Sequence, residues 1–308
     1  MLETVIETKS LSKIYGRFTA LDKVDVTVHR GDIYGLIGDN GAGKTTLLKL
    51  LTGQVFPSGG ELCMLGAHQP KELEGVRRRT GALIEDAGFY PQLTVEQNIE
   101  YYRLQKGVPG RGQVEQVLAL VGLADKRKKR CRDLSMGMKQ RLGLAIALIG
   151  EPELLILDEP INGLDPSGII EMRQLLQKLN REKNITIVLS SHILSELEQL
   201  ATVYGFLSQG KLLEQISAEQ LMEKCADYIE IAVSEPERYT VLLERTLAHC
   251  QYKVMADGTI HIINPSEDID VYSQLAGDHQ LHIYKLTRKK MALEDYYVNL
   301  KNGGAPLC

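Results

Sequence analysis

The chain carries the run Gly38-Asp39-Asn40-Gly41-Ala42-Gly43-Lys44-Thr45, and Thr46 follows it. This run fits the phosphate-binding pattern GxxxxGK[ST] at every position, and it lies between the apolar stretch Ile33–Ile37 and a leucine-rich helical stretch. Glycine lets backbone N–H groups turn toward phosphate oxygens, and the helix that follows contributes a positive N-terminal end. The run therefore predicts a triphosphate site. We expect Lys44 to reach the β- and γ-phosphates and Thr45 to bind Mg²⁺.

A pair of acidic residues follows a second apolar run, Leu154–Leu157. Asp158 is expected at the end of a buried strand, where it would hold the Mg²⁺ shell. Glu159 is the candidate base that orients or deprotonates the attacking water. Taken alone, the two acids could simply begin a loop. Together with a phosphate-binding run, they favour a catalytic role.

Strand-like and helix-like stretches alternate through the first two thirds of the chain. A third apolar run, Ile185–Leu189, follows the first two, and helical patterns separate all three. Continuous apolar strands with helices between them are typical of a parallel sheet that is covered on both faces. A mostly helical insert is expected at about 86–150, and Val24–Val28 alternates like a half-exposed antiparallel strand.

The pattern changes at about residue 217, which predicts two domains, 1–217 and 218–308. Alternating runs and helical stretches in the second part indicate a small α+β domain. Its expected elements include a helix over Pro236–Cys250 and a strand over Leu281–Leu286. The dipeptide Asp257-Gly258 lies between two alternating runs, which predicts a β-hairpin with a two-residue loop.

The composition excludes several classes of protein. The 308 residues are 44% hydrophobic and 25% charged with a net charge of −4, which argues against disorder and gives no global positive field for nucleic acid. The 5 cysteines include no CxxC pair, which favours a reducing compartment and disfavours a zinc site. No signal-peptide pattern and no apolar run of about 18 residues are visible, so we expect a chain that does not cross a membrane by itself.

Three further motifs appear in a fixed order along the chain. Leu134-Ser135-Met136-Gly137-Met138 precedes Asp158, Asn162-Gly163-Leu164-Asp165-Pro166 follows it, and Leu189-Ser190-Ser191-His192 ends the third apolar run. With the phosphate-binding run, these motifs make the chain resemble the ATP-binding cassette (ABC) ATPases that drive transporters. The motifs look like the signature loop, the D-loop and the switch histidine of that family. The resemblance covers about residues 1–217.

The resemblance implies a fold, ligands and partners. The implied fold is the α/β P-loop ABC fold, with a mostly parallel sheet, an antiparallel β-subdomain and a helical insert, followed here by the small C-terminal α+β domain. The implied ligands are ATP and Mg²⁺. The chain would be a cytoplasmic ATPase subunit, peripheral on the inner face of the cell membrane. It would power a separate transmembrane permease and pair with a second copy of itself, with no nucleic acid expected.

The resemblance also assigns roles to individual residues. Tyr15 sits where the family stacks an aromatic ring on adenine, although on its own it could pack against the edge of a sheet. Ser135 and Gly137 would contact the γ-phosphate held by the other copy. Asp165 would make a contact across the dimer, although it could be a plain N-terminal acid of a helix. His192 would hydrogen-bond the γ-phosphate and hold the catalytic acid and water in place.

Two departures from the family pattern stand out. Glu85 replaces the glutamine that contacts Mg²⁺ and senses the membrane subunit, and a carboxylate is a suitable Mg²⁺ ligand. Together with Gly88–Pro91, this glutamate is similar to the bacitracin-resistance and lantibiotic-immunity subgroup, which implies export of an antibiotic or antimicrobial peptide. The segment Glu85–Tyr90 would grip a helix of the permease. Met136 and Met138 replace a glycine and the glutamine of the signature, which predicts slow turnover.

Other interpretations remain open at this point. Six of the seven residues Lys126–Arg132 are basic, which suits a solvated surface, anionic lipid headgroups or nucleic acid. A soluble ABC-type ATPase acting on ribosomes or DNA is one alternative function, although such relatives usually carry tandem cassettes or long coiled coils. A nucleotide sensor that does not hydrolyse ATP is another, and the intact Lys44, Asp158 and Glu159 count against it.

Overall fold

The computed structural model of the protein describes residues 3–85, 88–110, 112–224, 227–249, 251–290 and 293–302. The chain forms two compact units, one that ends at Ala218 and one that begins at Glu219. The expected start of the helical insert at residue 86 and the expected end of a helix at Cys250 lie outside the described residues.

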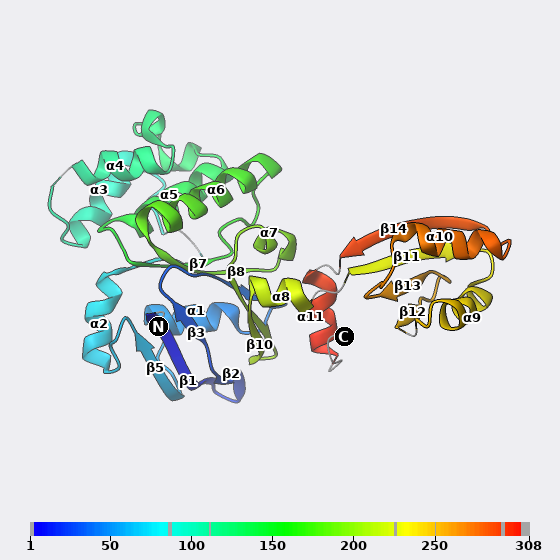
Figure 1. The fold of residues 1–308 in the computed structure, drawn as a ribbon. Coiled ribbons are helices and arrows are strands. Elements are labelled where there is room, and N and C mark those ends of the chain that lie inside the picture. The colour runs from blue at the N-terminus through cyan, green and yellow to red at the C-terminus, as the bar shows by residue number, and fades with distance from the viewer. Residues whose placement is uncertain are drawn as a thin grey trace. The chain divides into compact units, whose positions relative to one another are not determined.

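A six-stranded sheet forms the centre of the first unit (Figure 1). Its strand order is β10-β9-β4-β8-β7-β6, and all neighbours are parallel except the antiparallel edge pair of β10 and β9. The strands are β4 (Ile33–Ile37), β6 (Thr80–Leu83), β7 (Leu154–Asp158), β8 (Thr186–Ser191), β9 (Val203–Ser208) and β10 (Lys211–Ser217). Every residue of β4 and β7 is buried, as expected for strands covered on both faces. The prediction of a mostly parallel sheet is confirmed.

An antiparallel sheet accompanies the central one. Its strands are β1 (Thr4–Tyr15), β2 (Phe18–Val24), β3 (Thr27–His29) and β5 (Gly59–Met64), and β1 pairs with each of the others. Helix α1 (Lys44–Thr52) lies between the two sheets (Figure 1). Its leucines share one core with Val5 and Ile6 of β1 and with Leu154 and Ile156 of β7. This core fixes the helix that follows the phosphate-binding run.

The single strand predicted over Val24–Val28 is wrong, because β2 ends at Val24 and β3 begins at Thr27. The side chain of Thr8 makes the break. Its hydroxyl donates to the carbonyl oxygen of Val24 at 2.9 Å and accepts from the N–H of Val26 at 2.8 Å. A side chain therefore takes the place of a neighbouring strand at these two backbone groups, which an alternation pattern does not reveal.

The predicted helical insert consists of α3 (Val95–Gln105), α4 (Gly112–Leu120) and α5 (Met136–Leu148). Helices α5 and α6 (Pro166–Lys183) lie on the face of the central sheet opposite α1 (Figure 1). The first unit also contains the short helices α2 (Pro70–Arg78) and α7 (Leu194–Glu198). Of the helices that the structure describes, none is long and apolar enough to cross a membrane.

Helix α5 contacts the edge strand β6 through backbone. A Cβ atom built on Gly81 would lie 2.3 Å from the carbonyl oxygen of Ala147 and 2.7 Å from Cδ2 of Leu155. A separation this short leaves room for no side chain at Gly81. The end of α5 and the strand that leads to Glu85 are therefore in direct contact.

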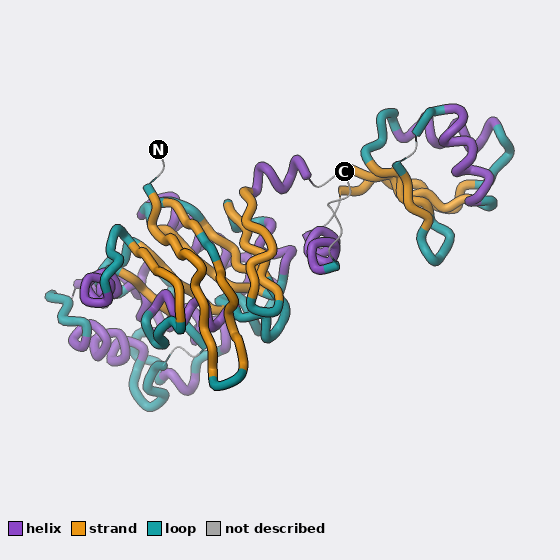
Figure 2. Tube along the Cα trace, turned by 90° about the horizontal axis from the view of Figure 1, so that it is seen from below, coloured by secondary structure: helices purple, strands orange, loops and turns teal. Residues whose placement is uncertain are grey.

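The second unit has the βαββαβ order of ferredoxin-like folds. Its sheet is antiparallel with the order β12-β13-β11-β14, and the two helices of the βαββαβ order lie on one side of the strands (Figure 2), where they share a core. In chain order the elements are α8 (Ala218–Lys224), β11 (Asp227–Val233), α9 (Pro236–Thr246), β12 (Tyr252–Val254), β13 (Ile260–Ile263), α10 (Ile269–Asp278), β14 (Ile283–Lys290) and α11 (Leu293–Lys301). This is an α+β arrangement, as predicted from the sequence.

The hairpin predicted at Asp257-Gly258 forms, but its loop has three residues and not two. The N–H of Met255 donates to the carbonyl oxygen of Thr259 at 2.8 Å, and the N–H of Gly258 donates back to Met255 at 3.0 Å. Gly258 has φ +83°, the left-handed conformation that closes a three-residue hairpin loop with a bulge. The Asp257-Gly258 dipeptide thus predicted the position of the turn correctly. The loop has one more residue than predicted, Ala256, because the hairpin closes with a bulge.

The strand predicted over Leu281–Leu286 is displaced toward the C-terminus, since β14 runs from Ile283 to Lys290. Its basic end is stabilised by an acid on the neighbouring strand β11. Lys285 and Lys289 place their ammonium groups 2.9 and 2.5 Å from the carboxylate of Glu230. These lysines are far from Glu230 in sequence. The sequence pattern therefore gave no sign that the strand continues beyond Leu286 to Lys290.

Candidate functional site

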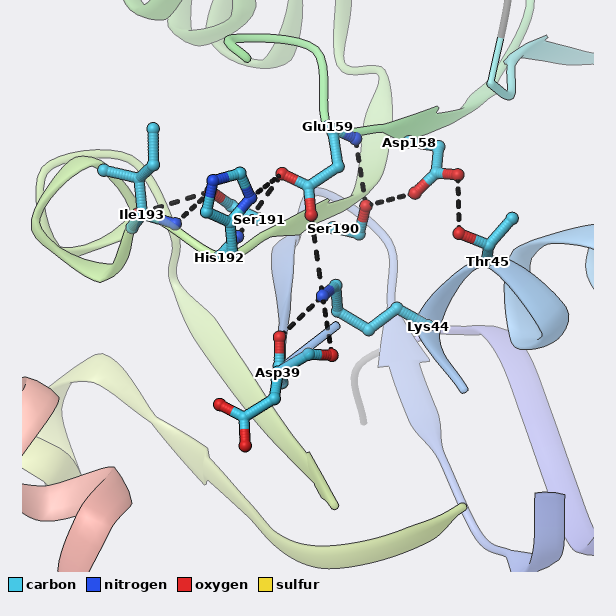
Figure 3. A network of polar contacts seen from close by, with 10 residues as sticks. Asp39, Lys44, Thr45, Asp158, Glu159, Ser190, Ser191, His192 and Ile193 are labelled. Carbon is cyan, nitrogen blue, oxygen red and sulfur yellow. Dashed lines mark hydrogen bonds and ion pairs between the residues drawn. The ribbon is translucent and has the colours of Figure 1, made fainter. Parts of the chain in front are cut away.

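The phosphate-binding run forms the loop between β4 and α1 and lines a cavity of about 310 Å³. The lining includes Asp39, Asn40, Gly41, Gly43, Lys44, Thr45, Thr46 and Glu159, whereas Gly38 and Ala42 are buried behind it. The Lys44 side chain is only 6% exposed, and its ammonium donates to the carbonyl oxygens of Gly38 at 2.5 Å and Asp39 at 3.3 Å. Figure 3 shows the Asp39 carboxylate pointing away from this ammonium. A buried positive charge thus lies at the floor of the loop.

Gly43 shows why this loop needs glycine. It caps the N-terminus of α1 with φ +109°, and a Cβ atom there would lie 2.7 Å from the carbonyl oxygen of Ala20. Only glycine fits this combination of space and backbone conformation. The first N–H groups of α1 receive no side-chain cap, and such groups form a ready anion site at a helix N-terminus.

A chain of hydroxyl and carboxylate groups links the loop to the ends of β7 and β8 (Figure 3). The hydroxyl of Thr45 donates to one oxygen of Asp158 at 2.8 Å, and the hydroxyl of Ser190 donates to the other at 2.6 Å. Ser190 also accepts from the N–H of Glu159 at 2.9 Å. Sequence reasoning gave no role to Ser190, although it stands next to Ser191 and His192 in the motif that ends the third apolar run. The structure identifies it as the residue that orients both acids.

The Glu159 carboxylate lies between two basic groups (Figure 3). Its Oε2 is 2.7 Å from Nδ1 of His192, and its Oε1 is 3.5 Å from the ammonium of Lys44. The backbone of Glu159 is left-handed, with φ +49°. Such a conformation is uncommon for a residue with a side chain and is held here by the hydrogen bond to Ser190. The structure therefore brings together Lys44, Glu159 and His192.

The signature-like and D-loop-like motifs meet in a separate cavity of about 590 Å³ that Ser135, Gly137 and Asp165 line. Ser135 caps α5, since its hydroxyl accepts from the N–H of Met138 at 3.4 Å. Asp165 caps α6, where hydrogen bonds from Ser167 and from the N–H of Gly168 lower the pKa of its carboxyl. Neither this cavity nor its lining includes Lys44 or Glu159. Ser135 and Asp165 thus each cap a helix. The two cavities of one chain are lined by different residues, so a nucleotide in the phosphate loop would not contact Ser135 or Gly137 of the same chain.

Met136 and Gly163 show how close these two motifs are. The Met136 side chain is half exposed, and its Cε lies 3.7 Å from the position that a Cβ atom would take on Gly163. The bulky residue thus rests on the D-loop-like motif without a clash.

Two aromatic residues stand at the turn between β1 and β2. Tyr15, the expected adenine platform, is 44% exposed, and the ammonium of Lys13 lies 4.9 Å from the centre of its ring. Phe18, its partner in the hairpin, is 64% exposed and lines the cavity of the phosphate loop. Sequence reasoning missed Phe18, whose only signal was its place three residues after Tyr15.

Glu85 lies outside the Thr45 and Asp158 network. Its carboxylate accepts from the ammonium of Lys49, on α1, at 2.6 Å. The Glu85 side chain is 62% exposed and its backbone is left-handed, with φ +60°. It also lines a cavity of about 390 Å³ with Phe89, Met136 and other residues. The sequence analysis did not single out Lys49, although it follows Thr45 by one helical turn.

The chemistry of the donors at Thr45 and Asp158 fits Mg²⁺. A hydroxyl and a carboxylate are hard oxygen donors, and proteins usually hold this ion through one or two such groups together with substrate phosphates. Within the described ranges, no cluster of three or more histidine, cysteine, aspartate or glutamate side chains could hold a metal by itself. An ion at this position would therefore share its ligands with a bound nucleotide.

The basic run at 126–132 folds as a surface loop with two short 3₁₀ turns, Ala124–Lys126 and Cys131–Asp133. Part of its charge is paired with neighbouring acids, as in Lys126 with Asp125, Arg127 with Glu96 and Glu115, and Arg132 with Asp133. Lys128, Lys129 and Arg130 form no ion pair with the residues that the structure covers. This pattern suits a solvated surface.

Comparison with known proteins gives consistent matches. The sequence profile described as "ABC transporter" matches residues 21–162. The chain is 41% identical over 303 residues to the bacitracin transport ATP-binding protein BcrA of Bacillus licheniformis, which covers 98% of this chain and 99% of that protein. It is also 41% identical over 209 residues to the lantibiotic transport ATP-binding protein SrtF of Streptococcus pyogenes, covering 68% of this chain and 89% of that protein.

The fold also matches solved structures. One of them, described as the dimeric structure of a bacterial ABC transporter cassette, has a TM-score of 0.63 and 25% identity. The match covers 69% of this chain and 98% of that one.

Proposed function

Since this chain belongs to the ABC transporter family, in which it is an ATP-binding subunit that hydrolyses ATP to power a separate permease, we propose that it drives export of a peptide antibiotic of the bacitracin or lantibiotic class. The observation that supports this substrate class most strongly is the 41% identity to a bacitracin transport protein over 98% of the chain. Because that match covers nearly the whole chain, it extends through the second unit.

The residues of the first cavity would bind the triphosphate. Backbone N–H groups of Gly38–Thr45 and the N-terminal end of α1 would face the phosphate oxygens. The Lys44 ammonium now donates to two carbonyl oxygens and lies near Glu159. It is buried and already points into the loop, so it can donate to the β- and γ-phosphates with little reorganisation. Tyr15 and Phe18 would bracket the adenine at the outer end.

We assign the metal position to Thr45, Asp158 and Glu85. When bound there, Mg²⁺ would neutralise charge on the phosphates. The Thr45 hydroxyl would be a direct ligand and Asp158 would hold the hydration shell, because these groups are already joined by a hydrogen bond of 2.8 Å. Glu85 would supply a third oxygen ligand from the end of β6.

Glu159 would orient or deprotonate the water that attacks the γ-phosphate. The carboxylate needs a fixed direction for this role, and three contacts supply one. Ser190 accepts its backbone N–H, His192 contacts one carboxylate oxygen and Lys44 lies near the other. Once ATP recruits Lys44, the carboxylate keeps its contact with His192 and faces the phosphate.

Two copies would pair head to tail around two ATP molecules. Each copy would bind one ATP with Gly38–Thr45 and cover the other with Ser135 and Gly137, and Asp165 would contact the opposite chain. The two cavities of one chain are lined by separate residue sets, which supports completion of each site by a second copy. Closure then depends on the γ-phosphate, because only ATP gives the covering residues something to hold.

The permease would dock on the surface that includes Glu85, Tyr90 and the exposed side of α3. Tyr90 and Tyr101 are 44% and 40% exposed and their hydroxyls share a hydrogen bond of 3.0 Å, and Leu104 one turn further is 63% exposed. Exposed aromatic and leucine side chains on one surface are typical of an interface with an apolar helix. The surface would be the inner face of the cell membrane, and the chain would be cytoplasmic and peripheral.

We further propose residues 1–217 as the ATP-binding domain and 218–308 as an accessory domain. The compact units divide near this position, after Ala218. The second unit has its own core, which Ile229 and Ile231 of β11 share with Tyr239 and Tyr272 of the two helices.

The other functions considered have less support. A nucleotide sensor would need no base held toward the phosphate loop, yet Glu159 is held by three groups. A soluble ATPase that acts on ribosomes or DNA is not favoured, because the similar relatives are transport proteins.

The substrate class can be tested in a sensitive strain that lacks its own exporters. The chain and its permease are expressed together, and inhibitory concentrations are measured for bacitracin, a lantibiotic and an antibiotic of an unrelated class. We expect a rise of at least about fourfold for a peptide antibiotic, and no rise when the chain carries Glu159→Gln. Equal inhibitory concentrations with the wild-type and variant chains for all peptide antibiotics would contradict the proposal.

A further inference from the structure

We propose that Lys49 is a positioning residue for metal-dependent ATP binding. Lys49 holds the Glu85 carboxylate on α1, and this contact competes with binding of the same carboxylate to the metal ion that accompanies ATP. This inference rests on the proposed function. It adds Lys49 to the site and a competition between the Lys49 ammonium and Mg²⁺ for the Glu85 carboxylate.

Lys49 shares one face of α1 with Thr45. It lies four residues after Thr45 on α1, and residues at i and i+4 are neighbours on one face of a helix. The metal position at Thr45 and the Lys49 ammonium are therefore about one turn apart on the same face. A carboxylate held by Lys49 is close to the groups that would bind the ion.

The register of the sheet places Glu85 and Asp158 at the same edge. In the parallel pair of β6 and β7, Leu83 lies opposite Leu157, the residue immediately before Asp158. Glu85 follows Leu83 by two residues, so both acids emerge from the same edge of adjacent strands. The backbone at Glu85 is left-handed, with φ +60°, so the chain turns directly after the strand. Glu85 thus contacts Lys49 at 2.6 Å and follows β6 at the same edge of the sheet where Asp158 ends β7.

The ion pair of Lys49 and Glu85 is weak because it is partly exposed to water. The side chains of Lys49 and Glu85 are 25% and 62% exposed, and exposed ion pairs shift an equilibrium by only about fivefold or less. Such a pair orders Glu85 but yields readily to a doubly charged ion with oxygen ligands nearby. Release of the Glu85 carboxylate from this pair therefore favours tighter metal-dependent ATP binding when Lys49 is absent.

The test measures ATP binding by calorimetry with Mg²⁺ and with EDTA, in chains that carry Glu159→Gln so that ATP persists. The quantity compared is the factor by which Mg²⁺ strengthens ATP binding. We expect Lys49→Met to raise this factor about two- to fivefold and Lys49→Arg to leave it as in the parent. In a chain that also carries Glu85→Gln, Lys49→Met should have no effect. Lys178→Met, which removes an exposed lysine paired with Glu182 on α6, is the matched control.

Three outcomes overturn the inference. An unchanged factor in Lys49→Met excludes a role for Lys49. An equal rise with and without Glu85→Gln shows that the charge acts through space and that Glu85 is not its intermediary. If Mg²⁺ fails to strengthen ATP binding even in the parent, the metal position of the proposed function fails as well, so the two failures are distinguishable.

Discussion

The Nδ1 atom of His192 lies 2.7 Å from Oε2 of Glu159, while the other carboxylate oxygen faces Lys44 at 3.5 Å. His192 directly follows β8, Lys44 begins α1, and Glu159 directly follows β7, so the arrangement depends on the central sheet and the helix beside it. The Glu159 carboxylate therefore contacts both Lys44, which would bind the phosphates, and His192, which would hydrogen-bond the γ-phosphate. This relationship leads to separate expectations for the acid and for the histidine.

Replacing Glu159 with glutamine removes the base but keeps the size and shape of the side chain. We expect steady-state hydrolysis to fall by about 10²- to 10⁴-fold, the usual contribution of a general base. ATP binding should persist, and the variant should accumulate as an ATP-bound dimer. Phosphate release and size-exclusion chromatography with ATP measure these two effects. A near-wild-type rate of hydrolysis in the variant would refute the assignment.

His192→Ala tests the residue that positions the acid. The carboxylate would lose its contact at 2.7 Å, and a small misplacement of a catalytic group can cost about 100-fold in rate. We expect kcat to fall by about that factor with a much smaller change in KM. His68→Ala is the control, because His68 is exposed and contacts the thiol of Cys63. An equal loss in both variants would argue against a specific role for His192.

Two aromatic residues can be tested as the adenine platform. Stacking of a base on an aromatic ring contributes about 1–3 kcal/mol, so Tyr15→Ala should weaken ATP binding by at least about fivefold. Phe18→Ala should also weaken it, since Phe18 lines the phosphate cavity. GTP binding should weaken in parallel, because stacking discriminates little between bases. Phe56→Ala serves as the control at a 71% exposed position. Unchanged affinity in both the Tyr15 and Phe18 variants would exclude this platform.

The second unit should lose stability in acid through Glu230. Hydrogen bonds from Lys289 and Lys285 lower the pKa of this carboxyl below its ordinary value of 4.5. The folded-state pKa is thus below the unfolded-state value, so the ionised carboxylate stabilises the fold above pH 4.5, and this stabilisation is lost as the pH falls through the folded-state pKa.

Amide exchange of β11 and β14 in the full chain, expressed as protection factors, measures this dependence. Glu230→Gln should flatten the fall of protection between about pH 5 and pH 3. Glu237→Gln changes an exposed acid on α9 of the same unit. This control should leave the fall of protection unchanged. If the Glu230 variant and the wild type show the same acid dependence, the lysine contacts do not control it.

Much of the central fold was predictable because buried parallel strands leave a simple signal. The strand Ile33–Ile37 was expected with the bounds that it has in the structure, since every one of its residues is buried. Prediction failed where a distant side chain sets the conformation. Thr8 separates β2 from β3, and Glu230 stabilises the basic end of β14. Neither effect can be inferred from the local pattern of hydrophobic and polar residues.

The candidate site shows the same division. Motifs with fixed spacing identified Lys44, Asp158, Glu159 and His192, whose positions follow from the ends of strands and the start of a helix. Phe18 and Lys49 escaped notice because their relevance depends on three-dimensional proximity. Phe18 reaches the cavity through the hairpin of β1 and β2, and Lys49 meets Glu85 only when α1 lies along the end of β6.

The missing side chain at Gly81 has a mechanical consequence. Because the backbone of β6 contacts the carbonyl oxygen of Ala147, the signature helix and the strand bearing Glu85 have no compressible layer between them. A displacement of α5 at Ser135 would therefore move the edge of the sheet with it. Under the proposed function, one glycine would thus join two elements that are distant in sequence into one stiff body, with the residue that covers nucleotide on one element and the residue beside the permease on the other.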